Sequence, residues 1–246
     1  MQQMTTARPG GRDRTVSEMT ATALGATLTR IGIGPGDQVI VPSYGPSAPA
    51  DGARLAGATP VFADIDPRTL CLSADAVAAA VTAGTAAVIP VNLFGYPAPV
   101  ESLGRIARQH GLALIEEAPL EEDLGETARR RARARFLDSA LTGVIVPYVE
   151  PGAYHRYHRY TVRIPGNGRP DRDAYARALA ARGVRAEIAV PTPVHRLPAH
   201  RAIGIPGLPQ TELAAADTLS LPIDSFTGER ELTRLAAVCN QLGRLV

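Results

Sequence analysis

Short apolar segments alternate with helical segments along the first half of the chain. Strands are predicted at 38–41, 60–62, 86–91 and 112–115, and helices between them at 48–55, 74–81 and 100–110. Strands and helices at this spacing are typical of βα units, which form a mostly parallel sheet with right-handed crossovers. The sequence therefore predicts an α/β fold: a mostly parallel sheet with flanking helices. A further helix is predicted to start at the capping-box spacing Thr15-Val16-Ser17-Glu18 and to run to Gly32.

The organisation changes after Asp123, where shorter and more varied segments follow. We expect a small C-terminal α+β domain there, so that residues 1–125 form the large domain and residues 126–246 the small one. Its predicted helices are 126–141, 171–182 and 229–242, its predicted extended segments are 143–146, 154–164 and 184–188, and 204–209 is predicted as a loop.

The charge pattern argues against several classes of partner. The net charge is +2, with acidic and basic residues interspersed, so we expect neither nucleic acid nor a membrane as partner. Cys71 and Cys239 are far apart and form no CxxC pattern, which argues against a disulfide scaffold or a zinc site. With no signal peptide and no apolar run of membrane-spanning length, the expected location is the cytoplasm.

The chain contains no lysine. All 26 residues in the combined count of lysine and arginine are arginines. A guanidinium stays protonated and forms no stable imine with an aldehyde, so arginine cannot replace lysine as an amine nucleophile. This sequence therefore excludes chemistry through a lysine Schiff base.

Seven segments of the sequence occur together in a recognisable order: 32–44, 55–66, 89–97, 110–118, 155–160, 190–195 and 219–222. In this order they resemble the DegT/DnrJ/EryC1/StrS sugar aminotransferases, which are pyridoxal-phosphate (PLP) enzymes of fold type I. The resemblance implies a truncated version of that large domain followed by its small domain, and subunits that pair as homodimers or as heteromers with a pathway enzyme.

The chain departs from this family at the positions that hold the cofactor. The family's phosphate-binding glycine is absent from Met19–Leu24, and its stacking ring falls on Pro46. Glu117 aligns with the aspartate that pairs with the pyridine nitrogen, and Leu120 with a family glutamine. The lysine-bearing segment, the strands after it and a phosphate contact to the partner subunit are missing between Asp123 and Glu126. We therefore predict no PLP cofactor and no transamination.

Candidate site residues lie at the carboxyl ends of the predicted strands, where parallel sheets collect their ligands. Glu116 and Glu117 point to opposite faces, and the alignment favours Glu117 as the one in the cleft: either a general base with a raised pKa or a structural carboxylate. His195, in a proline-flanked turn, is either a general acid or base or a packing residue. Position makes Tyr44, Asn92 and Glu116 substrate-binding candidates.

No metal ligands are predicted. His155 and His158 point to opposite faces of the predicted strand 154–164, which argues against joint ligation and favours packing for both. Tyr96 is predicted to pack in a turn.

Two functions from different classes fit these observations. In the first, a PLP-independent enzyme reuses the old cleft, with Glu117 and His195 as an acid–base pair for isomerisation, cyclisation or dehydration of a small molecule. That substrate would be sugar-like or natural-product-like, from natural-product or nucleotide-sugar biosynthesis, by analogy with the family. In the second, the chain is a non-catalytic partner subunit of a true aminotransferase or another pathway enzyme.

Overall fold

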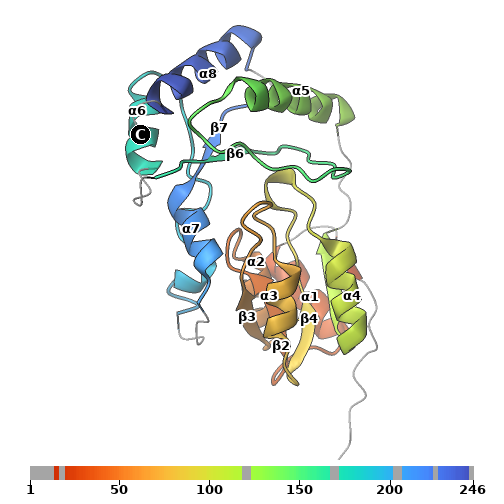
Figure 1. Ribbon diagram of the computed structural model, residues 1–246. Coiled ribbons are helices and arrows are strands. Elements are labelled where there is room, and N and C mark those ends of the chain that lie inside the picture. The colour runs from red at the N-terminus through yellow and green to blue at the C-terminus, as the bar shows by residue number, and fades with distance from the viewer. Residues whose placement is uncertain are drawn as a thin grey trace, which may run out of the picture.

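Two β-sheets organise the chain, one in each half. The computed structural model describes residues 14–16, 20–117, 123–166, 172–201, 207–223 and 227–243. The large sheet lies in the lower part of Figure 1, and the small sheet with its helices lies above it. This arrangement confirms the predicted α/β fold with a mostly parallel large sheet and a smaller C-terminal unit.

The large sheet is parallel throughout, with strand order β1-β5-β4-β2-β3. Successive strands are joined by helices, as parallel pairing requires. The strands are β1 (Arg14–Val16), β2 (Gln38–Pro42), β3 (Thr59–Ala63), β4 (Thr85–Val88) and β5 (Ala113–Glu117), and the helices are α1 (Ala21–Arg30), α2 (Ala48–Leu55), α3 (Ala74–Ala80) and α4 (Val100–His110).

Both faces of this sheet are buried. Side chains alternate along β2, so Val39 and Val41 pack with α1 and α2, while Ile40 packs with α3 and α4 on the other face. All three residues are fully buried. Burial on two faces explains why the strands read as continuous apolar runs in the sequence.

The predicted N-terminal helix begins too early. Thr15 lies in β1, opposite Glu116 of β5, and the helix starts only at Ala21, with Thr20 as its N-cap. Pairing with β5 supplies hydrogen bonds along this segment, and that tertiary interaction outweighs the local capping signal. Ser17 and Glu18 lie outside the described residues.

The C-terminal unit packs helices around a two-stranded antiparallel sheet. Its core combines residues from α5, α6 and α8 with the inner faces of both strands. The elements are α5 (Leu124–Ala140), β6 (Tyr160–Arg163), α6 (Arg172–Ala180), β7 (Thr218–Leu221) and α8 (Glu229–Gly243).

Three extended segments predicted in this unit are mostly not strands. Ile145 and Glu187 each form a single bridge, to Arg163 and Ser220, and the predicted strand 154–164 is β-paired only from Tyr160. Tyr157 has a φ of 48°, which breaks the extended conformation before β6. The prediction that His155 and His158 lie on one strand was therefore wrong.

A helix that the sequence did not predict, α7 (Pro209–Asp217), runs beside both sheets (Figure 1). Its first turn has no capping side chain of its own. Asp64, which follows β3, accepts hydrogen bonds there from the Gln210 and Thr211 amides at 2.9 and 2.8 Å and from the Thr211 hydroxyl at 2.8 Å. Pro209, the first residue of the helix, is a local start signal, whereas the group that caps the helix is far away in the sequence.

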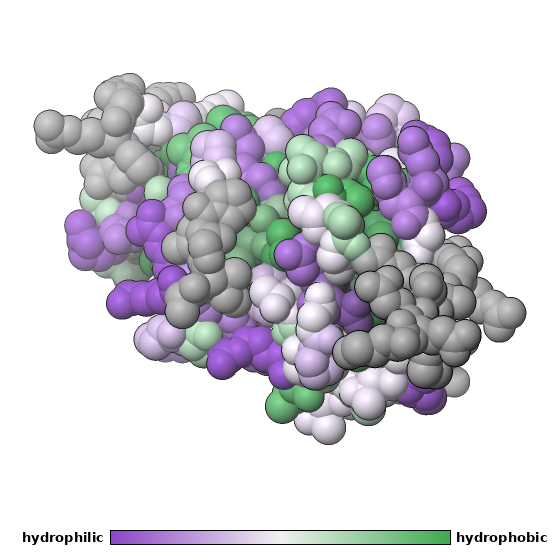
Figure 2. Space-filling model, turned by 90° about the horizontal axis from the view of Figure 1, so that it is seen from below, coloured by the Kyte–Doolittle hydropathy of each residue, from purple (hydrophilic) through white to green (hydrophobic). Residues whose placement is uncertain are grey.

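The surface mixes residue types. Figure 2 shows one end of the molecule, where hydrophilic residues surround smaller hydrophobic areas. Within the described residues, no helix has the length and apolar character needed to span a bilayer.

Candidate functional site

Ser43 and Tyr44, which follow β2, are buried and do not face an open cleft. Tyr44 is 1% exposed, and its hydroxyl lies 2.6 Å from the Thr218 hydroxyl. Thr218 also donates to the Ala214 carbonyl at 2.7 Å, so Tyr44 is the donor in this pair. Burial raises the pKa of Tyr44 to about 12. The structure thus places this substrate-binding candidate in a contact between the two sheets.

His195 lies between a hydroxyl and a carboxylate. It belongs to the short 3₁₀ helix η2 (Val194–Arg196) and is 2% exposed. Its Nδ1 lies 2.6 Å from Ser43 Oγ, and its Nε2 lies 2.8 Å from Glu212 Oε1 in α7. Because Glu212 is an acceptor, the proton is assigned to Nε2, and Ser43 then donates to Nδ1. Ser43 Oγ itself accepts from the His195 amide at 3.0 Å.

This Ser43–His195–Glu212 relay has the partners of an acid–base histidine, but its surroundings are closed. Ser43 is fully buried, and both imidazole nitrogens are occupied. Five cavities in the described part of the structure have neither Ser43 nor His195 in their lining. Burial and the two occupied ring nitrogens fit the packing interpretation of His195.

The remaining strand-end candidates occupy separate positions. Asn92 Oδ1 accepts from the Ala98 amide at 2.9 Å and so closes its own loop. Glu116 is half-buried within β5, and Glu117 is the last residue of that strand. The side chain of Glu117 lies outside the described part of the structure. The roles predicted for these three residues stay predictions.

The positions that resemble the family's PLP contacts do not suit that cofactor. Thr20, at the start of α1, uses its hydroxyl to cap its own helix, accepting from the Ala23 amide at 3.2 Å. Pro46 offers no ring to stack on a pyridine, and Leu120 lies outside the described residues. With no lysine for an internal aldimine, these residues do not fit PLP.

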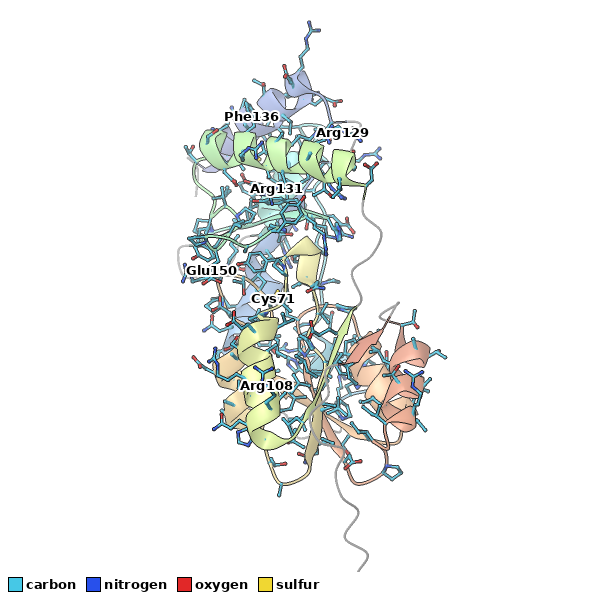
Figure 3. All side chains as sticks on the ribbon, turned by 90° about the vertical axis from the view of Figure 1, so that its right-hand side faces the viewer. Cys71, Arg108, Arg129, Arg131, Phe136 and Glu150 are labelled. Carbon is cyan, nitrogen blue, oxygen red and sulfur yellow. The ribbon has the colours of Figure 1, made fainter. Side chains whose placement is uncertain are left out.

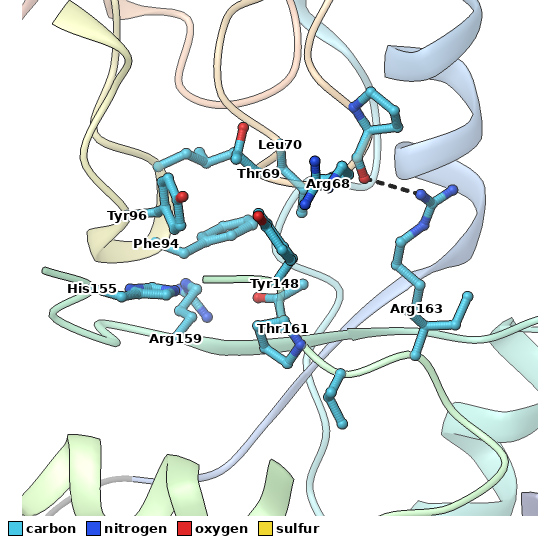
Figure 4. A pocket seen from close by; sticks show the side chains of 15 residues that line it. Arg68, Thr69, Leu70, Phe94, Tyr96, Tyr148, His155, Arg159, Thr161 and Arg163 are labelled. Carbon is cyan, nitrogen blue, oxygen red and sulfur yellow. Dashed lines mark hydrogen bonds between the residues drawn. The ribbon is translucent and has the colours of Figure 1, made fainter. Parts of the chain in front are cut away.

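The structure does contain an open cavity, of about 230 Å³, between the two sheets (Figure 4). One wall comes from the loop after β3 and from the 3₁₀ turn η1 (Leu93–Gly95), and the other from residues 145–148 and the start of β6. Arg68, Arg159 and Arg163 line it together with apolar and aromatic side chains. Two lining residues, Tyr96 and His155, were predicted only as packing residues.

Backbone strain gathers at this cavity. Leu70, Phe94 and Tyr157 have φ values of 62°, 56° and 48°, and they are the only non-glycine residues with positive φ in the described part of the chain. Leu70 and Phe94 line the cavity, and Tyr157 stacks on the lining residue His155 at 3.9 Å. A positive φ at a residue other than glycine costs about 1–3 kcal/mol, and such residues are common at ligand sites.

His155 is held as a neutral ring. Burial lowers its pKa to about 4, because the charged form would lose its water. Nδ1 accepts from the Tyr157 amide at 3.0 Å, and the ring packs edge-on against Tyr96 at 5.3 Å. From α5, Arg131 donates to the His155 carbonyl at 2.9 Å and lies over the Tyr154 ring (Figure 3). The histidine thus adds no charge to the cavity.

No metal site emerges from the described residues, which contain no group of three or more His, Cys, Asp or Glu side chains able to hold an ion. The two cysteines are free and buried, and burial raises the pKa of Cys71 to about 12.

Comparison with known proteins places these features in context. The chain is 28% identical to the Pleiotropic regulatory protein of Geobacillus stearothermophilus over 291 positions, which cover 82% of this chain and 77% of that protein. It is 42% identical to GDP-perosamine synthase of Caulobacter vibrioides over 119 residues, 48% of this chain but only 32% of the synthase.

Solved structures share the fold. DesV of S. venezuelae, solved in complex with a ketimine intermediate, superposes with a TM-score of 0.83 at 24% identity, covering 92% of this chain and 83% of DesV. A DegT DnrJ EryC1 StrS aminotransferase from Brucella abortus gives 0.82 at 22% identity, with coverage of 91% and 84%. The sequence pattern of the DegT/DnrJ/EryC1/StrS aminotransferase family matches residues 14–121 and 119–240, nearly the whole chain, and the chain belongs to that family.

Proposed function

We propose that this chain is a non-transaminating, PLP-independent member of its family that acts by binding, as a non-catalytic partner of a pathway enzyme. The observation that carries the proposal is the absence of lysine. The alignment with the Pleiotropic regulatory protein supports an internal loss, because its 291 positions exceed the 246 residues of this chain. Without the amine, neither cofactor anchoring nor its proton transfer is available.

The geometry of the strand ends favours binding over acid–base catalysis. The hydroxyl of Tyr44 and both ring nitrogens of His195 form internal hydrogen bonds, and both side chains are buried. These groups join the two sheets instead of facing a substrate. The name of the Geobacillus relative supports a regulatory role for a member of this family.

A second candidate is the PLP-independent acid–base enzyme with Glu117 and His195 as its pair. The Ser43–His195–Glu212 relay favours it, because a carboxylate that orients an imidazole is the arrangement used by general bases. In this version the cleft opens to admit a sugar-like or natural-product-like substrate to His195.

Native mass spectrometry of the protein purified from its own host tests the proposal. We expect a chain without PLP, bound to a lysine-bearing family member or another enzyme of the same pathway. A chain that carries PLP would overturn PLP independence. A homo-oligomer that turns over a pathway intermediate, with activity lost in Glu117→Gln while circular dichroism is unchanged, would establish the enzyme instead.

A further inference from the structure

We propose that the cavity between the two sheets is a binding site for a small planar monocarboxylic acid about one ring in size. The inference does not depend on the proposed function, because the site is formed by this chain alone. Its three supports are the charge balance of the arginines, the apolar walls and the strained backbone.

Two of the three arginines are neutralised within the protein. Arg163 Nε and Nη2 donate to Asp217 Oδ2 at 2.9 and 2.7 Å, and Arg159 pairs with Glu187. Arg163 Nη1 also donates to the Pro67 carbonyl at 3.1 Å, the dashed line of Figure 4. These contacts fix two walls of the cavity and leave little charge for a ligand.

Arg68 is different. Its guanidinium lies 3.7 Å from the centre of the Tyr148 ring, and the described residues provide it with no ion pair to a carboxylate. Asp66 and Glu150 line the adjoining hollow without pairing with it. Stacking holds the guanidinium plane in place, and its N–H groups then form the planar fork that matches a carboxylate. Arg68 is therefore the lining arginine whose guanidinium has no direct ion pair among the described residues, while the Asp66 carboxylate accepts from the Arg68 amide at 2.7 Å in the adjoining hollow.

The rest of the lining selects the body of the ligand. Its walls are mostly apolar or aromatic, with Thr69 and Thr161 as further polar residues, and the neutral His155 ring closes one side. A volume of about 230 Å³ lies below the ~300–1,000 Å³ typical of drug-sized ligands, so the occupant is small. The principal apolar residues are Leu70, Leu93, Phe94, Tyr96, Ile145 and Pro147.

The strained residues make an accidental cavity a poor explanation. Leu70, in the loop after β3, and Phe94, in η1, belong to two loops that form one wall. Each has a left-handed backbone conformation, and each lines the cavity. A leucine or phenylalanine at positive φ persists only where the surroundings dictate it, and such positions are concentrated at ligand clamps. Leu70 belongs to a buried hydrophobic cluster and Phe94 packs against it, so this packing holds the shape of the wall.

Benzoate is the first probe, measured by isothermal titration calorimetry. We expect a dissociation constant of about 1 mM or below, which requires from the roughly nine heavy atoms of benzoate a ligand efficiency between that of drug-sized ligands and the ceiling for the smallest ones. Benzyl alcohol, with the same ring but no charge, should bind at least about tenfold more weakly, because the charge-assisted hydrogen bonds to Arg68 are lost.

Variants assign the binding to this cavity. Arg68→Gln should weaken benzoate binding at least about tenfold, and Ile145→Trp should block it while keeping the charge. Ile145 is 54% exposed, so the larger ring does not disturb the core. Arg105→Gln, on the exposed side of α4, is the matched control and should bind as the wild type does.

Three results would overturn the proposal. The first is no saturable benzoate binding at about ten times the expected dissociation constant. The second is benzoate binding that Arg68→Gln and Ile145→Trp leave unchanged, which would place the ligand elsewhere. The third is Arg68-dependent binding of inorganic phosphate without binding of benzoate, which would assign the site to a phosphate group.

Discussion

His155 connects the stability of the cavity wall to pH. The ring is buried, stacks on Tyr157 and is held by the Tyr157 amide, and burial lowers its pKa to about 4. In the unfolded chain an ordinary histidine titrates near 6.5. Below that pH the unfolded state therefore binds a proton that the native state does not, and the native state loses stability as the pH falls toward 4.

We expect this single group to reduce the free energy of unfolding by up to about 3 kcal/mol between pH 7 and pH 4. His155→Phe keeps the ring and removes the proton-binding site, so its stability should fall less over the same interval. Urea unfolding of both proteins at several pH values measures the difference. His110→Gln, at the exposed end of α4, is the control; parallel pH profiles for His155→Phe and wild type would contradict the argument.

Residue positions were predicted from the sequence, whereas the partners of the side chains were not. Tyr44 and Asn92 follow strands and His195 lies in a proline-flanked turn, as the sequence indicates, and their polar atoms bond to Thr218, Ala98 and Ser43. Two of these partners are more than 150 residues away from them in the sequence. A catalytic or substrate-binding role requires a side chain whose polar atoms are free to contact the substrate. The local sequence does not show which distant group will form a hydrogen bond with that side chain.

At the scale of elements, α1 and α2 pack at very short range. Gly52 in α2 faces α1, and a Cβ there would lie 2.6 Å from Leu24 Cβ and 3.1 Å from the Ala21 carbonyl. Neither atom is the free end of a flexible side chain, so the helices must separate. We expect Gly52→Ala to destabilise the protein by about 1–3 kcal/mol, although alanine favours helix.

Gly104→Ala is the matched control for that change. Gly104 is also buried within a helix, but its Cβ would approach most closely the mobile end of Arg108, at 3.2 Å. Helix propensity should then dominate and raise stability by up to about 1 kcal/mol. Chemical denaturation of both variants checks the opposite signs, and two changes of the same sign would show that helix spacing does not decide the outcome.

Helix α7 depends on a carboxylate from the other half of the chain. Asp64 satisfies two amides and a hydroxyl in its first turn, where the negative charge also complements the helix dipole. Asp64→Ala should cost about 2 kcal/mol and should speed hydrogen exchange in α7 before other helices. Asp75→Ala, in the exposed first turn of α3, should change stability by less than about 1 kcal/mol; equal effects would refute a special role for Asp64.

Helices with local signals were predicted best. The predicted bounds of α2 and α4 match the structure, and α3 begins at its predicted residue, where Ser73 accepts from the Ala76 amide as a local cap. The predictions of strands at 143–146 and 184–188 were wrong. Each segment pairs with the two-stranded sheet through a single bridge only, which is too little to form a strand. Helix α7 was not predicted: Pro209 marks its first position, but its capping group, Asp64, is far away in the sequence. In each failure a non-local contact, or the lack of one, decided the structure.

At the scale of the whole molecule, several polar contacts join the two sheets. Tyr44 donates to Thr218, Arg163 donates to Pro67, and Asp64 caps α7. Val194 and Leu208, from the second half, complete the core on one face of the large sheet. The predicted boundary at residue 125 therefore marks a change of organisation along a chain whose two halves share core residues. The division into two domains at this residue stays a prediction.

These shared contacts predict a single cooperative unfolding transition. Amides of β2 and of β6 should exchange with the same free energy of global opening, because neither sheet keeps its core when the other unfolds. Tyr44→Phe leaves the Thr218 hydroxyl without its donor and should lower that free energy by about 1 kcal/mol in both sheets together. Hydrogen exchange followed by mass spectrometry across a urea series measures both values. Earlier opening of β6 and β7 by more than about 1 kcal/mol would instead show two domains that unfold separately.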